Sequence, residues 1–197
     1  MQFLSMSGGL IAVCVIVPIV VIVLLFAIWY IATRNKLVAL VNDVDESYSA
    51  MDVHLKKRHD LIGNLVETCK GYSKFEKDTL VQVTEARKLA IAASPDQKAQ
   101  AESQLASSLR TLLNAVNESY PELKANGQFN NLSAQLESLE HEIANSRKFY
   151  NAKIKLYNNK VAQFPSSIVA RGMHLERRSF FELDDVSERA VPKVSFD

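Results

Sequence analysis

The residues of this sequence that could do chemistry are a few charged side chains that interrupt apolar stripes. Counting forward from Met51 and Leu55 in helical steps of four and three, the next position is Arg58 rather than an apolar residue. A similar gap occurs near Arg147 in a later segment. A charge on an apolar helical stripe is costly unless it is paired and hydrogen-bonded. The pattern therefore predicts ion pairs between helices.

One antiparallel alignment gives both charges a partner. With Leu37 beside Phe164, Arg58 faces Glu140 and Asp52 faces Arg147. The pairs can fix the register and handedness of packed helices, which is the commoner use of such residues, or they can line a polar pocket or partner site. Simple surface exposure is a third possibility. The candidate interhelical polar network consists of Asp52, Arg58, Asn64, Glu140, Arg147 and Asn151.

No sequence motif points to catalysis. The chain has no P-loop, no Gly-rich dinucleotide turn, no nucleophile elbow and no His-Glu-x-x-His. His54 and His59 are five residues apart, so they point to different sides of a helix. Glu137, Glu140 and His141 share one face and could contribute to a metal site, but a surface or seam cluster is far commoner. We therefore predict no catalytic residue, no metal ion and no cofactor.

Nucleic acid is also excluded as a partner. The 197 residues include 23 basic and 22 acidic side chains, for a net charge of +1. The basic run Lys56–His59 has no aromatic interleaving and belongs to no nucleic-acid-binding signature. It lies about 36 Å beyond the apolar N-terminal segment if the helix is upright, too far for lipid headgroups. Lys56 and Lys57 are therefore expected on a solvated face.

The N-terminal segment predicts a membrane span. The first 33 residues carry no charge, and 9–32 is long enough to cross a bilayer, with Trp29 and Tyr30 at its interfacial end. A cleavable signal peptide does not fit, because no basic residue precedes a run that is also too long. Arg34 and Lys36 follow the span. By the positive-inside rule, the N-terminus lies outside and the remaining chain in the cytoplasm.

The rest of the chain predicts an all-α fold. Apolar residues step by four and three along two long segments, 37–69 and 128–164, with shorter helices over 73–93 and 95–120. Short connections make consecutive helices antiparallel neighbours. We predict an exterior N-terminus at 1–8, a transmembrane helix at 9–32, an elongated antiparallel bundle of about four helices at 33–164, and an irregular C-terminal tail at 165–197. The tail either packs on the bundle or is partly disordered.

Several motifs closely resemble the LemA family signature. They include Tyr48, Met51–Glu67 and Lys70–Tyr72; Val83–Arg87; Tyr120–Asn126; Phe129; Glu140, Arg147, Tyr150 and Asn151; and the ending Pro192–Phe196. The resemblance covers essentially the whole chain. It implies a bacterial protein with an N-terminal membrane helix, a short exterior N-terminus and an elongated antiparallel helical domain. It implies no enzymatic activity. Some relatives are associated with magnetosome membranes, which suggests a membrane-organising role by analogy.

These inferences give one preferred function and two alternatives. We expect a scaffold or interaction protein anchored in the bacterial inner membrane through residues 9–32, binding a protein partner and able to form a homo-oligomer. The first alternative is a subunit of a membrane-remodelling or pore-like assembly, and the second is a metal-dependent enzyme. The mass of the solubilised protein distinguishes the first two, and elemental analysis tests the third.

Overall fold

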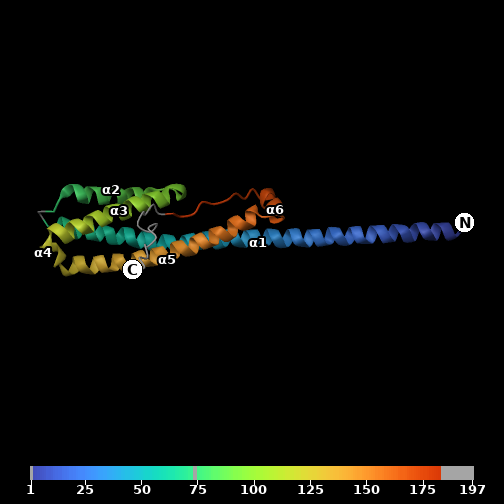
Figure 1. The fold of residues 1–197 in the computed structure, drawn as a ribbon, viewed down its shortest axis with the longest axis horizontal. Helices are drawn as coiled ribbons and strands as arrows, with labels where there is room; N and C mark the ends of the chain where they lie inside the picture. Colours follow the sequence, from blue (N-terminus) through green and yellow to red (C-terminus); the bar gives the residue numbers. More distant parts are fainter. Residues whose placement is uncertain (1, 73–74, 183–197) are drawn as a thin grey trace, which may run out of the picture. The chain divides into compact units, whose positions relative to one another are not determined.

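The computed structural model describes residues 2–72 and 75–182, with side chains from residue 13 onward, and within these residues every regular element is a helix (Figure 1). This confirms the predicted all-α fold. The elements are α1 (Gln2–Lys70), α2 (Lys77–Ala92), α3 (Pro95–Ser119), α4 (Pro121–Lys124), α5 (Gly127–Ala162) and α6 (Ser166–Gly172).

Helix α1 has 69 residues and continues from the apolar segment into the charged part of the chain without a break. Pro18 is its only internal proline. Proline removes one backbone hydrogen bond, which a long helix tolerates. Among the described residues, only the stretch that begins at Val13 in this helix is long and apolar enough to cross a membrane. It is therefore the candidate membrane anchor, as predicted.

Local sequence signals set the ends of the shorter helices. Pro95 and Pro121 each occupy the first turn of a helix, where proline's missing N–H costs nothing. Asn126 precedes α5, and its Oδ1 accepts hydrogen bonds from the backbone N–H groups of Gln128 and Phe129 at 2.9 and 3.0 Å. Such a side-chain cap satisfies donors that a helix N-terminus leaves free. The side chain of Asn126 therefore caps the start of α5.

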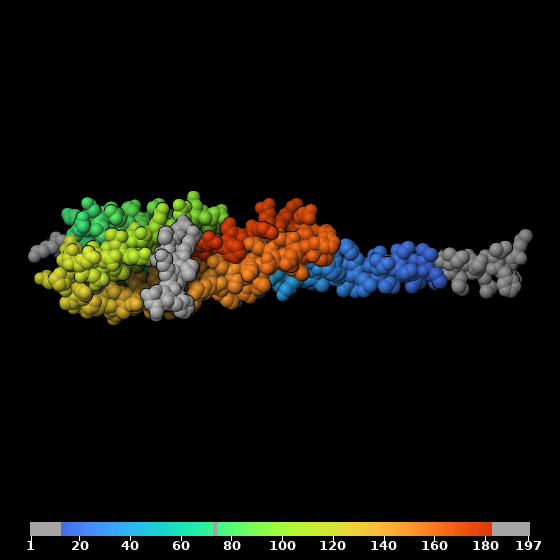
Figure 2. Space-filling view, in the orientation of Figure 1, coloured from blue at the N-terminus to red at the C-terminus, as the bar shows by residue number. Residues whose placement is uncertain are grey.

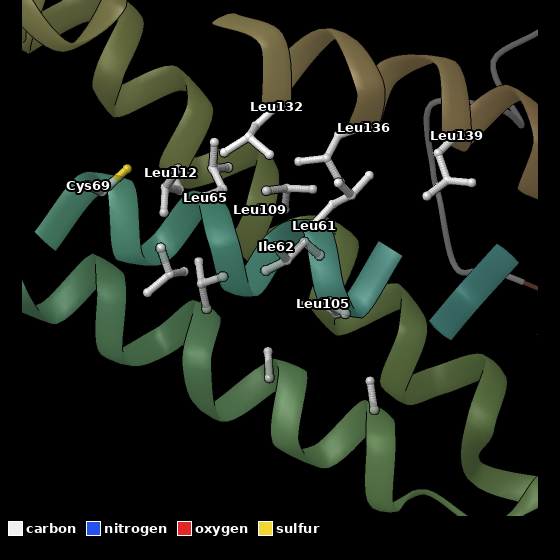
Figure 3. Close-up of a cluster of buried hydrophobic side chains, with 14 of the residues drawn as sticks. Leu61, Ile62, Leu65, Cys69, Leu105, Leu109, Leu112, Leu132, Leu136 and Leu139 are labelled. Atoms are coloured by element: carbon white, nitrogen blue, oxygen red, sulfur yellow. The ribbon is translucent and has the colours of Figure 1, made fainter. Parts of the chain in front are cut away.

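The chain divides into two compact units. The first unit is Met1–Asp45 with Lys153–Arg178, and the second is Glu46–Ala152 with the described residues after Arg178. The core of the second unit is built from the apolar stripes of α1, α2, α3 and α5 (Figure 3). Its fully buried members include Leu55, Ile62 and Leu65 of α1 and Leu105 and Leu112 of α3.

The predicted pairing of α1 with α5 is present within each unit. In the first unit, Lys153 Nζ lies 3.1 Å from Asp43 Oδ2. In the second unit, the ring centroids of Tyr48 and Tyr150 are 5.6 Å apart. These residue pairs match the predicted antiparallel register to within about one helical turn.

The C-terminal segment is more regular than predicted. Residues 165–197 were expected to lack helix, yet Ser166–Gly172 form α6, whose Val169 and Ala170 are buried with Leu37 in the core of the first unit. Two turns are too short to show a helical period, which is why the sequence pattern missed them. Beyond α6, the Tyr157 hydroxyl donates to the carbonyl of Glu176 at 2.8 Å. The expectations for residues 183–197 lie outside the described residues.

Candidate functional site: a buried ionic cluster

The second unit contains a cluster of charged side chains inside its core. Arg58 of α1 is fully buried on the apolar stripe between Leu55 and Ile62, and Glu102 of α3 is fully buried opposite it. The Arg58 guanidinium donates to the Glu102 carboxylate through Nη2. Its other terminal nitrogen, Nη1, donates to both carboxylate oxygens of Glu140 on α5, at 2.9 and 3.2 Å. One arginine therefore joins three helices.

His59 and Lys98 extend the cluster around Glu102. His59 Nε2 lies 2.9 Å from Glu102 Oε1, and Lys98 Nζ lies 3.9 Å from the same oxygen. Lys98 also donates to the carbonyl of Ala90 at 3.0 Å. The Glu102 carboxylate is thus surrounded by three nitrogen-bearing side chains, which compensate for its removal from water.

The surroundings of Glu102 keep it ionised. Burial by itself raises the pKa of this carboxyl, but the hydrogen bond with His59 and the positive charge of Arg58 outweigh it. The pKa of Glu102 consequently lies below its usual value. Burial likewise disfavours the charged form of Arg58, but Glu140 and Glu102 more than compensate and raise the pKa of the guanidinium. Both groups therefore carry their charges at neutral pH.

Helix α2 is tied to the same region through Arg87. The Nε–H group of Arg87 donates to the backbone carbonyl of His59 at 2.6 Å. This carbonyl belongs to α1, so the contact fixes α2 against the turn of α1 that carries Arg58 and His59. The cluster and its neighbours therefore connect all four longer helices of the second unit.

The predicted Arg58–Glu140 pair is present, but the other predicted network residues have different surroundings. Asp52 Oδ2 lies 2.9 Å from Lys56 Nζ, and Asp52 Oδ1 lies 4.0 Å from Lys98 Nζ. Arg147 is buried on α5. Its predicted pairing with Asp52 stays a prediction.

The two asparagines lie apart from the cluster. The side chain of Asn64 is exposed on α1, so it lies outside the buried cluster, and its predicted membership of an interhelical network stays a prediction. In the sequence Asn64 stands between the core residues Ile62 and Leu65. Around the helix it is rotated by about 100° from Leu65, toward the outer side. Asn151 binds the C-terminal segment instead: its Nδ2 donates to the carbonyl of Phe181, and its Oδ1 accepts from the Phe181 N–H, at 3.0 and 2.9 Å.

The sequence prediction missed Glu102, His59 and Lys98. A signal for two of them exists, because the apolar stripe of α3 at Leu105, Leu109, Leu112 and Val116 extends backward by three and four to Glu102 and Lys98. Both side chains are buried. A search for polar residues on the stripe of every helix, rather than only the two long ones, would have found them.

The charged groups of the cluster are paired with one another. Its carboxylates face cations, and within the described residues no group of three or more His, Cys, Asp or Glu side chains could hold a metal ion. Glu137 and His141, which the sequence offered as metal ligands beside Glu140, are exposed. Burial raises the pKa of the Cys69 thiol to about 11, so this cysteine stays protonated at neutral pH. The arrangement can hold four helices in one register.

Comparison with known proteins places these features in a family context. The model of the LemA family matches residues 47–196, which include Arg58, Glu102 and Glu140. The chain is similar to "Protein LemA" of Metamycoplasma hominis, with 26% identity over 164 residues that cover 82% of this chain and 74% of the relative.

Proposed function

Because the chain belongs to the LemA family, we propose that it is a membrane-anchored scaffold that presents a rigid helical bundle to protein partners at the inner face of the bacterial cell membrane. One observation carries the proposal. The same uninterrupted helix, α1, is apolar and exposed on all sides from Val13 to Ile28 and goes on to supply the buried stripe of the bundle. Such a helix links a membrane anchor directly to the domain built around it.

The first part of α1 supports the anchor. Its large apolar side chains are exposed around the whole helix circumference, with Val13, Val17, Ile22, Leu25 and Ile28 each more than half exposed. Soluble proteins rarely leave a continuous apolar surface of this extent in water. Residues 9–32 span about 36 Å as a helix, enough for a hydrocarbon core of about 30 Å. A bilayer is the environment that suits this surface.

The flanking charges support a cytoplasmic bundle. No lysine or arginine precedes the apolar run, and Arg34 and Lys36 follow it directly. Basic flanks stay on the cytoplasmic side of bacterial membranes. A fluorescent protein fused to the C-terminus should fold and emit. An alkaline phosphatase fusion that becomes active at the same position would contradict the proposed orientation.

The buried cluster supports a structural role for the bundle. Arg58 uses its two terminal nitrogens to bind carboxylates on two other helices. A charge network of this kind specifies which helices meet and in which register. A rigid domain of this type suits a protein that displays surfaces rather than one that turns over a substrate. We therefore propose that the protein is not an enzyme.

A homo-oligomeric membrane-remodelling or pore-like assembly is the second candidate. Exposed apolar side chains on three helices of the second unit favour it: Val53 of α1, Leu89 of α2 and Phe149 of α5. These are positions at which a second copy or another protein could bury surface. They are therefore the sites at which partners should be sought.

The two candidates are separated by mass and by crosslinking. Photo-crosslinking residues are placed one at a time at Val53, Leu89 and Phe149 in the full chain in native membranes, and Glu67, an exposed residue about 21 Å along α1 from Val53, is the control position. Scaffold function predicts an adduct at Val53 with a defined second protein. A ladder at multiples of 22.0 kDa at Val53 would favour the assembly instead. No adduct at Val53, Leu89 or Phe149 would contradict both.

A further inference from the structure

The bend that follows α5 and includes α6, residues 163–172, carries the most exposed aromatic side chain among the described residues. Phe164 is 81% exposed, and Ile168, one turn later, is 53% exposed. The rest of the bend is well anchored, because Val169 and Ala170 are buried, and the Ser166 hydroxyl donates to the carbonyl of Lys160 at 2.7 Å. Two large apolar groups are therefore held outward on a fixed support, which we call the α5–α6 corner.

The first unit places this corner at the end of the apolar run. Val169 and Ala170 form one cluster with Leu37, and Trp29 packs against that cluster. Trp29 precedes Ala32, the last residue of the apolar run, by three residues, or about 4.5 Å along the axis. An element that packs near Trp29 therefore lies at the level of the headgroups if 9–32 spans the bilayer.

The burial pattern of α1 marks the same level. Thr33, Leu37, Leu40 and Val44 form a buried stripe that starts one turn after Trp29. Before Trp29, the described side chains of α1 are exposed. On the face shown in Figure 2, the orange and red surface of α5 and α6 lies against part of α1, and the blue surface of α1 nearer its N-terminus is uncovered. The corner is thus the edge of the protein cover that faces the proposed bilayer.

The charge of the first unit suits an anionic surface. It contains eight basic and three acidic side chains, a net charge of +5, although the whole chain carries only +1. Both aspartates are paired within the unit, Asp43 with Lys153 and Asp45 with Arg178. Arg34, Lys36 and Arg171 are exposed around the end of the apolar run. Anionic headgroups attract such a cluster, whereas the same face of a second copy would repel it.

We propose that the α5–α6 corner is a second membrane contact, which inserts Phe164 and Ile168 into the headgroup layer of the anionic leaflet from which the span emerges. This proposal rests on the proposed membrane anchor. Exposed aromatic and aliphatic groups flanked by basic residues are typical of interfacial binding. Two contact points on the first unit would fix the tilt of that unit relative to the membrane, which a single helix does not.

Tryptophan quenching tests the corner. Trp29 is the only tryptophan of the chain, so Trp29→Phe provides a background in which Phe164→Trp reports on the corner alone. The matched control is Leu156→Trp in the same background, because Leu156 is 54% exposed in the same unit, eight residues earlier. Each protein is reconstituted in vesicles of phosphatidylcholine and phosphatidylglycerol with a nitroxide quencher on the headgroup.

The proposal predicts that Phe164→Trp loses as large a fraction of its emission as Trp29 does in the unmodified protein, and that Leu156→Trp loses much less. Omitting phosphatidylglycerol, or introducing Lys160→Gln and Arg171→Gln together, should weaken the quenching at position 164. Quenching of Trp29 with none at position 164 would overturn the corner and leave the anchor intact. A blue shift at position 164 that is independent of lipid would indicate contact with a second copy. Absence of quenching at both positions would overturn the anchor and the corner together.

Discussion

The part of α1 that precedes Trp29 and the part around Arg58 use one continuous helix for two opposite surfaces. The first, over the described side chains of residues 13–28, is apolar in every direction and exposed, and it has no charged residue. The second is apolar along one stripe, and the stripe buries a guanidinium between two carboxylates. In the first part the environment must supply the apolar contacts, and in the second part the other helices do. The buried charge of Arg58 therefore distinguishes the stripe of the bundle from the anchor, which carries no charged residue.

The largest expected effect comes from removing the centre of the cluster. Glu102→Ala leaves Arg58 buried with only Glu140, so the free energy of unfolding should fall by about 3–5 kcal/mol. Thermal unfolding of the full chain in detergent measures this. Glu67→Ala, which breaks the exposed pair with Lys70, should cost less than about 1 kcal/mol. Equal small losses from both variants would mean that the cluster contributes no more than a surface pair.

The second-largest effect is expected from a substitution in the proposed membrane anchor rather than in the bundle. Val21→Arg places a charge near the middle of the apolar run and should cost about 2.5–3.5 kcal/mol of insertion free energy. Vesicle flotation should therefore recover less of this variant with lipid, while its thermal unfolding stays unchanged. Val53→Arg adds the same charge at an exposed site of the bundle and serves as the control. Equal flotation of both variants would argue against a span.

The pair that the sequence predicted has its own test. Arg58→Ala and Glu140→Ala should each lower the melting temperature, and the double mutant should differ from their sum by about 0.5–3 kcal/mol, because the groups contact each other directly. A double-mutant cycle in thermal unfolding supplies the coupling energy. Additive effects would show that the two side chains act independently.

The register made this pair predictable, whereas the stripe of α3 predicts that Glu102 is buried but not that Arg58 is its partner. Apolar steps of four and three place Arg58 and Glu140 at one level once α1 and α5 are antiparallel, so two sequence segments suffice. Glu102 lies on α3, and no pairing rule states which of several helices faces Arg58. Helix α6 was missed for a different reason, because a helix of seven residues carries too few apolar positions to show a period.

The smallest effect concerns pH. The folded pKa of Glu102 lies below its unfolded value of about 4.3, so its ionised form stabilises the folded state above that pH. This stabilisation is lost as the pH falls through the folded pKa. Unfolding curves should therefore show a decline in stability below about pH 4 that is shallower in Glu102→Gln. The same slope in both proteins would assign the decline to other carboxylates.

Alkaline carbonate extraction of membranes from cells that produce the full chain tests the central claim most directly. The protein should stay in the membrane pellet, because residues 9–32 of α1 cross the hydrocarbon core. The Val21→Arg variant provides the internal comparison and should be released in greater proportion. Quantitative release of the unmodified protein into the carbonate supernatant would show that α1 does not span the membrane and would contradict the account.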